Sequence, residues 1–173
     1  METCAEEDGG RKRWNFAECP PISTYIYAVA AGPYHVVSDT HADIPLSILC
    51  RQTMAKYLDA EELFTLTKQG LEFYAGFFGK YPYAKYDQAF VPEFNEGAME
   101  NVGLVTFTEA YVYRDTPTQS QRLSRADTIL HEMAHMWFGD LVTMSEWVEC
   151  VGCLCLCLCL CLCLCLCLCL CTS

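Results

Sequence analysis

The sequence has few basic residues, because its 173 positions include 11 Lys and Arg against 22 Asp and Glu. The resulting net charge of −11 excludes nucleic acid and anionic membrane surfaces as expected partners, since both require a positively charged protein surface. The same acidic balance fits a site that attracts cations, although a solvated acidic surface is the more common reason for such a charge.

Cysteine is also scarce outside one stretch. From Cys153 to Cys171 cysteine alternates with leucine without a break, and this tract holds ten of the 14 cysteines. The other four lack the spacing of a metal site, and they are Cys4, Cys19, Cys50 and Cys150. No charged and then apolar secretory segment is found at the N-terminus. These absences favour a reducing, cytoplasmic setting.

The Cys-Leu tail, residues 151–173, is unlike the rest of the chain. Val151 to Cys171 gives 21 uncharged residues, about the length that crosses a bilayer. However, no Lys or Arg flanks it, and its strict period of two is low complexity rather than a helical pattern. We therefore expect a repeat expansion, a frameshift or a gene-model error in preference to a membrane or aggregation-prone segment, and we expect a metal-binding tail least. Membrane contact is not expected unless this tail inserts.

The other residues alternate between strand and helix patterns. Residues 1 to about 13 are polar and predict a frayed start. Residues 20–37 are rich in β-branched and aromatic residues and predict one or two strands, with a turn near Gly32 and Pro33. Further along, the patterns predict a helix from Asp59 to Gly79, strands in KYDQAFVPEF and GLVTF, and a helix from about Ser120 to Phe138 between Thr118 as N-cap and Gly139 as stop. This order predicts an α+β fold.

The stretch HEMAH carries the strongest chemical signal. His131 and His135 are four residues apart, so on a helix they lie about 40° apart and can face one ion. Glu132 lies about 100° from His131, where it can contact a water beside the metal. This is the H-E-x-x-H pattern of zinc peptidases, in which two histidines bind zinc and the glutamate is the general base. A chance match is the alternative, at odds on the order of one in a hundred.

The residues after His135 distinguish between zinc peptidase classes. A metzincin has a glycine three residues and a histidine six residues later, where this chain has Phe138 and Leu141. That class is excluded. A gluzincin takes its third ligand from a glutamate on a following helix.

A second motif, GAMEN at Gly97 to Asn101, follows the NEG turn and precedes the GLVTF strand. Taken alone, Glu100 is explained as an ordinary acidic residue of a turn. Together with H-E-x-x-H it resembles the zinc aminopeptidases of the aminopeptidase N family, particularly actinobacterial-type members. The resemblance covers roughly Trp14 to Met144 and is carried by PPISTYI, AGPYH, KYDQAFVPEFNEGAMEN and TILHEMAHMWFGDLVTM, in that order.

The resemblance implies a hydrolase with one Zn²⁺ ion that releases N-terminal residues from peptides. His131 and His135 would be zinc ligands and Glu132 the general base. Glu100 would pair with the free α-ammonium group of the substrate, and so would set exopeptidase cleavage. The remaining expected substrate contacts are Gly97, Ala98, Met99 and Asn101. Glu100 also disfavours an endopeptidase of the thermolysin type, because an internal peptide bond offers that carboxylate no partner.

The resemblance also implies an incomplete domain plan. Residues 1–43 would be the frayed start and the last strands of an N-terminal β-sandwich domain. Residues 44–150 would be the first half of a thermolysin-like α+β catalytic domain, and residues 151–173 the Cys-Leu tail.

The sequence departs from the family after Ser145. The third zinc ligand is expected nineteen residues after His135, at Leu154, which is not a carboxylate. Glu146 and Glu149 follow too short a connection to reach back from a second helix. We therefore expect low or no activity for this chain as written. The alternative is a non-enzymatic, truncated relative that at most binds zinc or peptide weakly.

Overall fold

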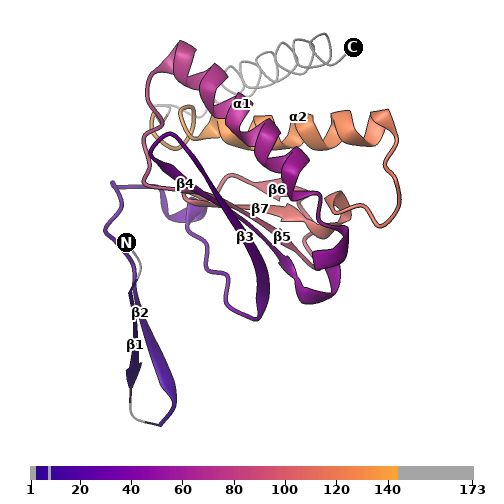
Figure 1. The fold of residues 1–173 in the computed structure, drawn as a ribbon. Helices are drawn as coiled ribbons and strands as arrows, with labels where there is room; N and C mark the ends of the chain where they lie inside the picture. The colour runs from indigo at the N-terminus through magenta and orange to yellow at the C-terminus, as the bar shows by residue number, and fades with distance from the viewer. Residues whose placement is uncertain (1–2, 8, 144–173) are drawn as a thin grey trace.

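The structure is a computed structural model that describes residues 3–7 and 9–143 (Figure 1). Its strands are β1 Thr3–Glu7, β2 Arg11–Asn15, β3 Tyr34–His41, β4 Ile44–Arg51, β5 Tyr86–Val91, β6 Ala98–Met99 and β7 Leu104–Thr108. Its helices are α1 Ala60–Phe78 and α2 Gln119–His135, with the short 3-10 turns η1 Thr24–Ile26, η2 Gln52–Tyr57 and η3 Glu109–Tyr111. The mixture of sheet and helices confirms the predicted α+β class.

Five strands form the main sheet, in the order β3-β4-β5-β7-β6. The strands β4, β5 and β7 run parallel, whereas β3 and β6 are antiparallel edge strands. Both helices lie over the same face of this sheet (Figure 1). In β4 alternate residues are buried, because one face of the strand meets the core, while five of the six residues of the central strand β5 are buried.

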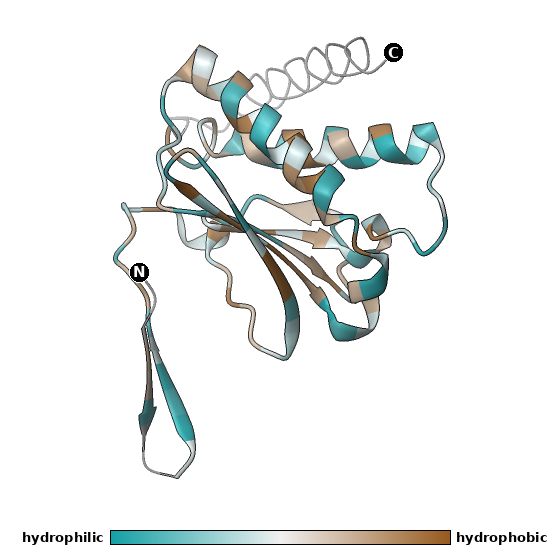
Figure 2. Ribbon diagram, viewed as in Figure 1, coloured by the Kyte–Doolittle hydropathy of each residue, from teal (hydrophilic) through white to brown (hydrophobic). Residues whose placement is uncertain are grey.

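The hydropathy pattern follows this layering. Figure 2 shows the strands of the main sheet as largely hydrophobic, whereas the helices carry both hydrophobic and hydrophilic bands. Such banding is typical of helices that bury one side against a sheet. Among the described residues, no helix is both long enough and apolar enough to cross a bilayer.

The N-terminus differs from its prediction. In place of a frayed start, β1 and β2 form a hairpin that projects away from the main sheet (Figure 1). Gly9 and Gly10 make the turn with φ of 83° and 72°, and Glu6 lies opposite Lys12 in the register. Cross-strand pairs of opposite charge favour such pairing. The polar residues bury nothing, as predicted, because every residue of β2 is exposed.

Residues 20–37 were predicted to form one or two strands with a turn near Gly32, and the structure confirms one of them, because β3 begins at Tyr34. No strand forms before Gly32. Residues 16–33 hold only the short turn η1, and several of their large apolar side chains are exposed, among them Tyr27 and Val29 at 72% each. Strand propensity alone does not create a strand where no neighbouring edge is available to pair.

The strand β3 was predicted to end a preceding β domain. Instead it pairs with β4 along all eight residues, from Tyr34 opposite Arg51 to His41 opposite Ile44. The predicted boundary between residues 43 and 44 therefore falls inside this hairpin, and β3 belongs to the same sheet as β4. A β-sandwich and a division of the whole chain into domains stay predictions.

The helix α1 confirms its predicted bounds. The Asp59 carboxylate accepts a hydrogen bond from the Glu62 amide at its start, and Gly79 ends it with φ 87°. The apolar spacing buries one stripe: Leu63, Phe64, Thr67, Gly70, Leu71 and Tyr74. Thr67 is satisfied inside this stripe, because its hydroxyl donates to the Leu63 carbonyl and accepts from the Gln88 amide.

The helix α2 starts as predicted and ends earlier. Thr118 and Gln121 form a reciprocal capping box at its start. Regular helix stops at His135 rather than Phe138, because the chain tightens there into a turn in which the Met136 amide bonds the Met133 carbonyl. The end at Gly139 was therefore placed a few residues too late, a common error for helix boundaries.

The two helices pack closely at Gly70. A Cβ added there would lie 2.7 Å from Leu130 Cδ2 and 2.8 Å from Met133 Sδ, so only glycine permits this approach. One turn further, the Tyr74 hydroxyl donates to the Leu130 carbonyl at 3.0 Å. These contacts reach Leu130, directly before the H-E-x-x-H residues, and Met133 within them, so α1 packs against the segment of α2 that carries the motif.

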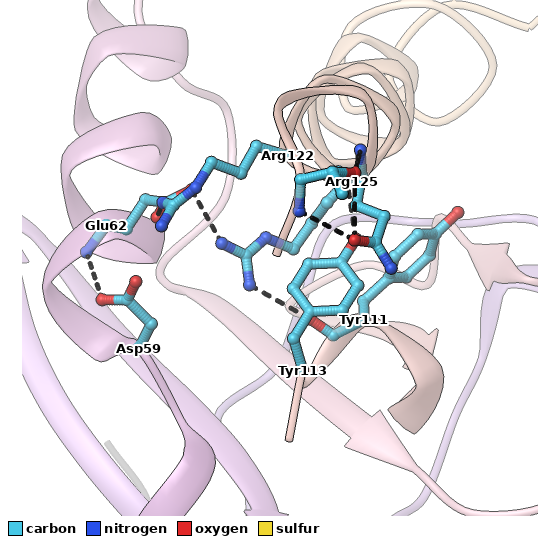
Figure 3. Close-up of polar contacts among 8 residues, drawn as sticks. Asp59, Glu62, Tyr111, Tyr113, Arg122 and Arg125 are labelled. Atoms are coloured by element: carbon cyan, nitrogen blue, oxygen red, sulfur yellow. Dashed lines mark hydrogen bonds and ion pairs between the residues drawn. The ribbon is translucent and has the colours of Figure 1, made fainter. Parts of the chain in front are cut away.

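A polar cluster joins the other ends of the helices (Figure 3). Arg125 of α2 is 2% exposed and donates to the Glu62 carboxylate of α1 at 2.7 Å and to the Tyr111 carbonyl at 3.1 Å. Its guanidinium also lies over the Tyr113 ring, 4.9 Å from the centroid. Arg122 forms a second ion pair with Glu62 at the surface. A buried arginine is tolerated here because several partners replace its water.

Candidate metal centre

The last two turns of α2 carry the histidine pair. The spacing of four residues puts both imidazoles on one side of the helix, and their Nε2 atoms lie 3.2 Å apart. The rings meet edge to face, with centroids 4.8 Å apart and an angle of 82° between planes. The histidine pair predicted from the sequence is therefore brought together, with its nitrogen atoms converging.

The separation of these nitrogens fits a shared zinc ion. Two nitrogen ligands about 2.0–2.1 Å from a tetrahedral ion lie about 3.3 Å from each other. The distance of 3.2 Å between His131 Nε2 and His135 Nε2 agrees with this value. The histidines present therefore suit two ligand positions of a zinc site without rearrangement.

The backbone sets the protonation of His135. Its Nδ1 lies 3.0 Å from the Phe138 carbonyl oxygen, which can only accept a hydrogen bond. The neutral imidazole therefore carries its proton on Nδ1 and presents the lone pair of Nε2 toward His131. This is the tautomer that a metal requires at Nε2.

Glu100 joins this centre from the sheet. One ligand atom each of Glu100, Glu132 and His135 lies within 4.8 Å of the others. Glu100 directly follows the edge strand β6, in which Ala98 pairs with Phe107 and Met99 pairs with Thr106. The sheet thus carries the GAMEN glutamate to the helix that holds H-E-x-x-H, and the two sequence motifs form one site.

The other GAMEN residues divide into two groups. Gly97, Ala98 and Met99 are half-buried and lie along an edge strand whose inner side is bonded to β7, including a bond from the Thr108 amide to the Gly97 carbonyl at 2.7 Å. Asn101 is 5% exposed, and its side-chain amide donates to Thr106 at 3.1 Å. Asn101 therefore braces the turn, and its expected contact with substrate stays a prediction.

The electrostatics of the centre are dominated by burial. Glu132 is 7% exposed, and burial, followed by the nearby carboxylates of Glu100 and Asp140, raises its pKa to about 8. Burial and the neighbouring His135 lower the pKa of His131. Both shifts favour uncharged side chains, which is what low-dielectric surroundings do to isolated charges.

Asp140 is a residue of this centre that the sequence patterns did not single out. It is 4% exposed, and neither carboxylate oxygen has a hydrogen-bond partner among the described residues. Burial, followed by the charge of Glu100, raises its pKa to about 8. The available signal was its place directly after Gly139 at the end of α2. That signal is weak, because acidic residues are common in turns.

The predicted third ligand position, Leu154, lies outside the described residues. The same is true of Glu146, Glu149 and the whole Cys-Leu tail. Within residues 3–7 and 9–143, the carboxylates that gather with His135 are those of Glu100 and Glu132. The described part therefore supplies two histidines, a buried carboxylate and a second carboxylate from the sheet.

Comparison with known proteins identifies the family. Residues 63–151, about half of the chain, match the peptidase family M1 domain. The chain is 50% identical over 139 residues to aminopeptidase N of Streptomyces lividans, which covers 78% of this chain and 16% of that protein. It is 36% identical over 143 residues to aminopeptidase 2 of Candida albicans, covering 81% and 15%.

A further relative is the tricorn protease-interacting factor F2 of Thermoplasma acidophilum, which is 37% identical over 140 residues, or 79% of this chain and 17% of that protein. The chain thus spans about a sixth of the length of these relatives. The family match includes both GAMEN and H-E-x-x-H, the motifs that form the metal centre. The predicted resemblance is confirmed, and the chain belongs to peptidase family M1, together with these aminopeptidase N relatives.

Proposed function

We propose that this site is the zinc-binding half of an aminopeptidase centre, which releases residues from the free N-terminus of peptides. The observation that carries the proposal is the convergence of Glu100, Glu132 and His135 within 4.8 Å, because it joins a metal-ligand helix to an acidic residue of the sheet. His131 and His135 would hold the ion. When bound, zinc would supply Lewis acidity toward water and the peptide carbonyl.

Glu132 is the proposed general base. It lies on the helix directly after His131, is 7% exposed, and forms no ion pair with Lys or Arg among the described residues. A buried carboxylate beside the reacting groups can hold a proton taken from water and return it to the leaving amine. A buried carboxylate does not serve as a surface salt-bridge partner, so its proposed role in catalysis is the simplest reason for burying it.

Glu100 is the proposed recognition group for the substrate. A carboxylate at a set distance from the histidines favours a substrate whose α-ammonium lies one residue from the cleaved bond. The edge strand β6 supports this geometry, because its outer side can pair with an extended peptide as an added strand. The family resemblance assigns the backbone of Gly97 to Met99 to this pairing.

For the chain as written we propose low or no turnover, since leucine occupies position 154, where the family pattern has its third ligand. The second candidate function is therefore a non-enzymatic relative that binds zinc or peptide weakly. Peptides remain the proposed partners in both cases. A reducing, cytoplasmic setting remains a prediction from the sequence.

Two measurements on the purified chain test the proposal. Hydrolysis of an aminoacyl anilide is followed with and without a chelator, and zinc stoichiometry is measured by competition with a fluorescent chelator. Chelator-sensitive turnover supports the enzyme, whereas one bound zinc without turnover supports the second candidate. Zinc binding no tighter than that of the His131→Ala variant would overturn the enzyme and would leave only a peptide-binding relative.

Substrate recognition is tested separately by binding. The zinc-loaded chain is titrated with a short peptide and with its N-acetylated form, and the free amine is expected to bind more tightly. Glu100→Gln should abolish this preference, because it removes the negative charge and keeps the shape. Glu132→Gln is the matched control, since it neutralises a carboxylate of the same site and should retain the preference.

A further inference from the structure

The chain after α2 forms a closed loop, residues 136–142, which we call the post-helical loop. The Asp140 amide donates to the His135 carbonyl at 3.1 Å, and the Val142 amide donates to the Trp137 carbonyl at 3.2 Å. The Gly139 amide in turn donates to the Val142 carbonyl at 3.0 Å. Three backbone bonds therefore fold this loop back on the end of the helix.

The loop conformation places the Phe138 carbonyl and the Gly139 backbone against the His135 ring. The Phe138 carbonyl oxygen lies 3.0 Å from Nδ1, and a Cβ added at Gly139 would lie 3.3 Å from the same atom. Gly139 has φ 118°, a conformation that residues with a side chain rarely adopt. Glycine is thus required here for the backbone path and for the space beside the imidazole.

The loop is also anchored to α1. The Trp137 indole donates to the Gly79 carbonyl at 3.2 Å, and its side chain is 3% exposed. The Phe138 ring packs edge to face on Phe78, with centroids 4.6 Å apart. Trp137 and Phe138, the two residues that lead into this carbonyl, are therefore held by packing, which restrains the carbonyl from turning away from His135.

We propose that the post-helical loop is a positioning element for the second zinc histidine, in which the Phe138 carbonyl fixes the His135 tautomer and Gly139 makes room for the ring. The loop does not touch the metal or the substrate; it acts through His135. Holding the proton on Nδ1 keeps the lone pair of Nε2 available, 3.2 Å from His131 Nε2. The zinc part of this inference rests on the proposed function, whereas the tautomer part does not.

A loop that merely ends the helix would behave differently. In that case a change at Gly139 would lower stability, as at any glycine with positive φ, but would leave the protonated nitrogen of His135 unchanged. The tautomer is therefore the readout that separates positioning from a purely structural role.

The first experiment uses the unmodified, metal-free chain. Imidazole nitrogen NMR in alkaline buffer reports which nitrogen of each of the four histidines carries the proton, and His135→Gln assigns the signals. His135 is expected to be protonated at Nδ1. Protonation at Nε2, or an even mixture, would overturn the proposal without any variant having to fold.

The second experiment compares Gly139→Ala with Gly103→Ala. Gly103 also has positive φ, at 71°, but a Cβ there meets only Lys85, at 3.6 Å and 3.7 Å, so it reproduces the backbone strain without the histidine contact. Gly139→Ala should mix the His135 tautomers and raise the zinc Kd by about 10–100-fold, the usual range for ligand-supporting groups. Gly103→Ala should change neither.

If His135 has the same tautomer in Gly139→Ala and in Gly103→Ala, and the two variants have the same zinc Kd, the positioning role is contradicted. If the tautomer results are as expected but neither the unmodified chain nor Gly103→Ala binds zinc, the proposed metal function fails while the positioning of His135 stands. The two proposals can therefore fail independently.

Discussion

The helices α1 and α2 pack against each other, yet they bury different kinds of side chain. The buried stripe of α1 is apolar except for Thr67, whose hydroxyl is bonded inside the same helix. The buried residues of α2 include Arg125 and Glu132. The helix α1 therefore serves mainly to pack, whereas α2 accepts buried charges that a purely structural helix would avoid.

The two buried charges of α2 also differ from each other. Arg125 has an ion pair, a carbonyl acceptor and an aromatic ring as partners, so its charge is compensated (Figure 3). Glu132 lies among carboxylates, and burial followed by these neighbours raises its pKa to about 8. The charge of Arg125 is compensated at the structural end of α2, and Glu132 lacks such compensation at the end with the candidate metal centre.

The largest expected effect concerns packing by α1. Tyr74→Ala should lower the free energy of unfolding by about 3–5 kcal/mol, because a fully buried aromatic side chain is lost between the helices. Urea unfolding under reducing conditions, followed by circular dichroism, measures this change. Tyr74→Phe is the control and should cost about 1 kcal/mol, since it removes only the hydroxyl that donates to Leu130. Equal losses would mean that the hydrogen bond, rather than packing, joins the helices.

The next effect concerns the compensated charge of α2. Arg125→Ala should cost about 2–3 kcal/mol, below the usual cost for a broken buried pair because the Glu62 side chain is 31% exposed. Arg122→Ala removes the other ion pair of the same carboxylate, but its side chain is 43% exposed, so it should cost about 0–1 kcal/mol. The same unfolding assay compares them. Equal losses of unfolding free energy for Arg125→Ala and Arg122→Ala would contradict the distinction between the buried and the surface arginine.

A smaller effect tests the close approach of the helices. Gly70→Ala should cost about 1–3 kcal/mol, because the new methyl group overlaps Leu130 and Met133, whose flexible ends can move only partly. Gly76→Ala in the same helix has nothing within 4 Å of the new Cβ among the described residues, and should stabilise the chain by about 0.5–1 kcal/mol. Stabilisation by both substitutions would show that the helices can separate at no cost.

The smallest effect should be the same in both helices. Asp59→Ala and Thr118→Ala each remove a side chain that accepts a backbone hydrogen bond at an exposed helix start, and each should cost about 1 kcal/mol. Thermal unfolding of the two variants side by side checks this. A clearly larger loss for Thr118→Ala would indicate that the second bond of its hydroxyl, donated to the Gln121 side chain, adds stability that α1 lacks.

Local signals in the sequence predicted both helices well. Capping residues and apolar spacing specify α1 between Asp59 and Gly79, because these interactions are made within the helix itself. Of the one or two strands predicted in residues 20–37, only β3 is present, and no second strand forms before Gly32, since a strand needs a partner edge that its own residues cannot supply. The end of α2 failed for a third reason, because the post-helical loop depends on packing of Trp137 and Phe138 against α1.

The candidate site shows the same division. The convergence of His131 and His135 follows from a spacing of four on one helix, and could be predicted. The burial of Asp140 and the carbonyl bond to His135 could not, because both depend on how the loop folds back. No period or motif in the sequence reports the direction of a backbone carbonyl.

Residue types at short, regular spacings were enough to predict the two helices, the histidine pair and the family. The fold was needed to show that Glu100 lies with Glu132 and His135, that Arg125 is paired across two helices, and that the Phe138 carbonyl faces His135. Short-range order comes from hydrogen bonds within one segment. Contacts between distant segments depend on strand pairing and on which side chains fill the core between sheet and helices.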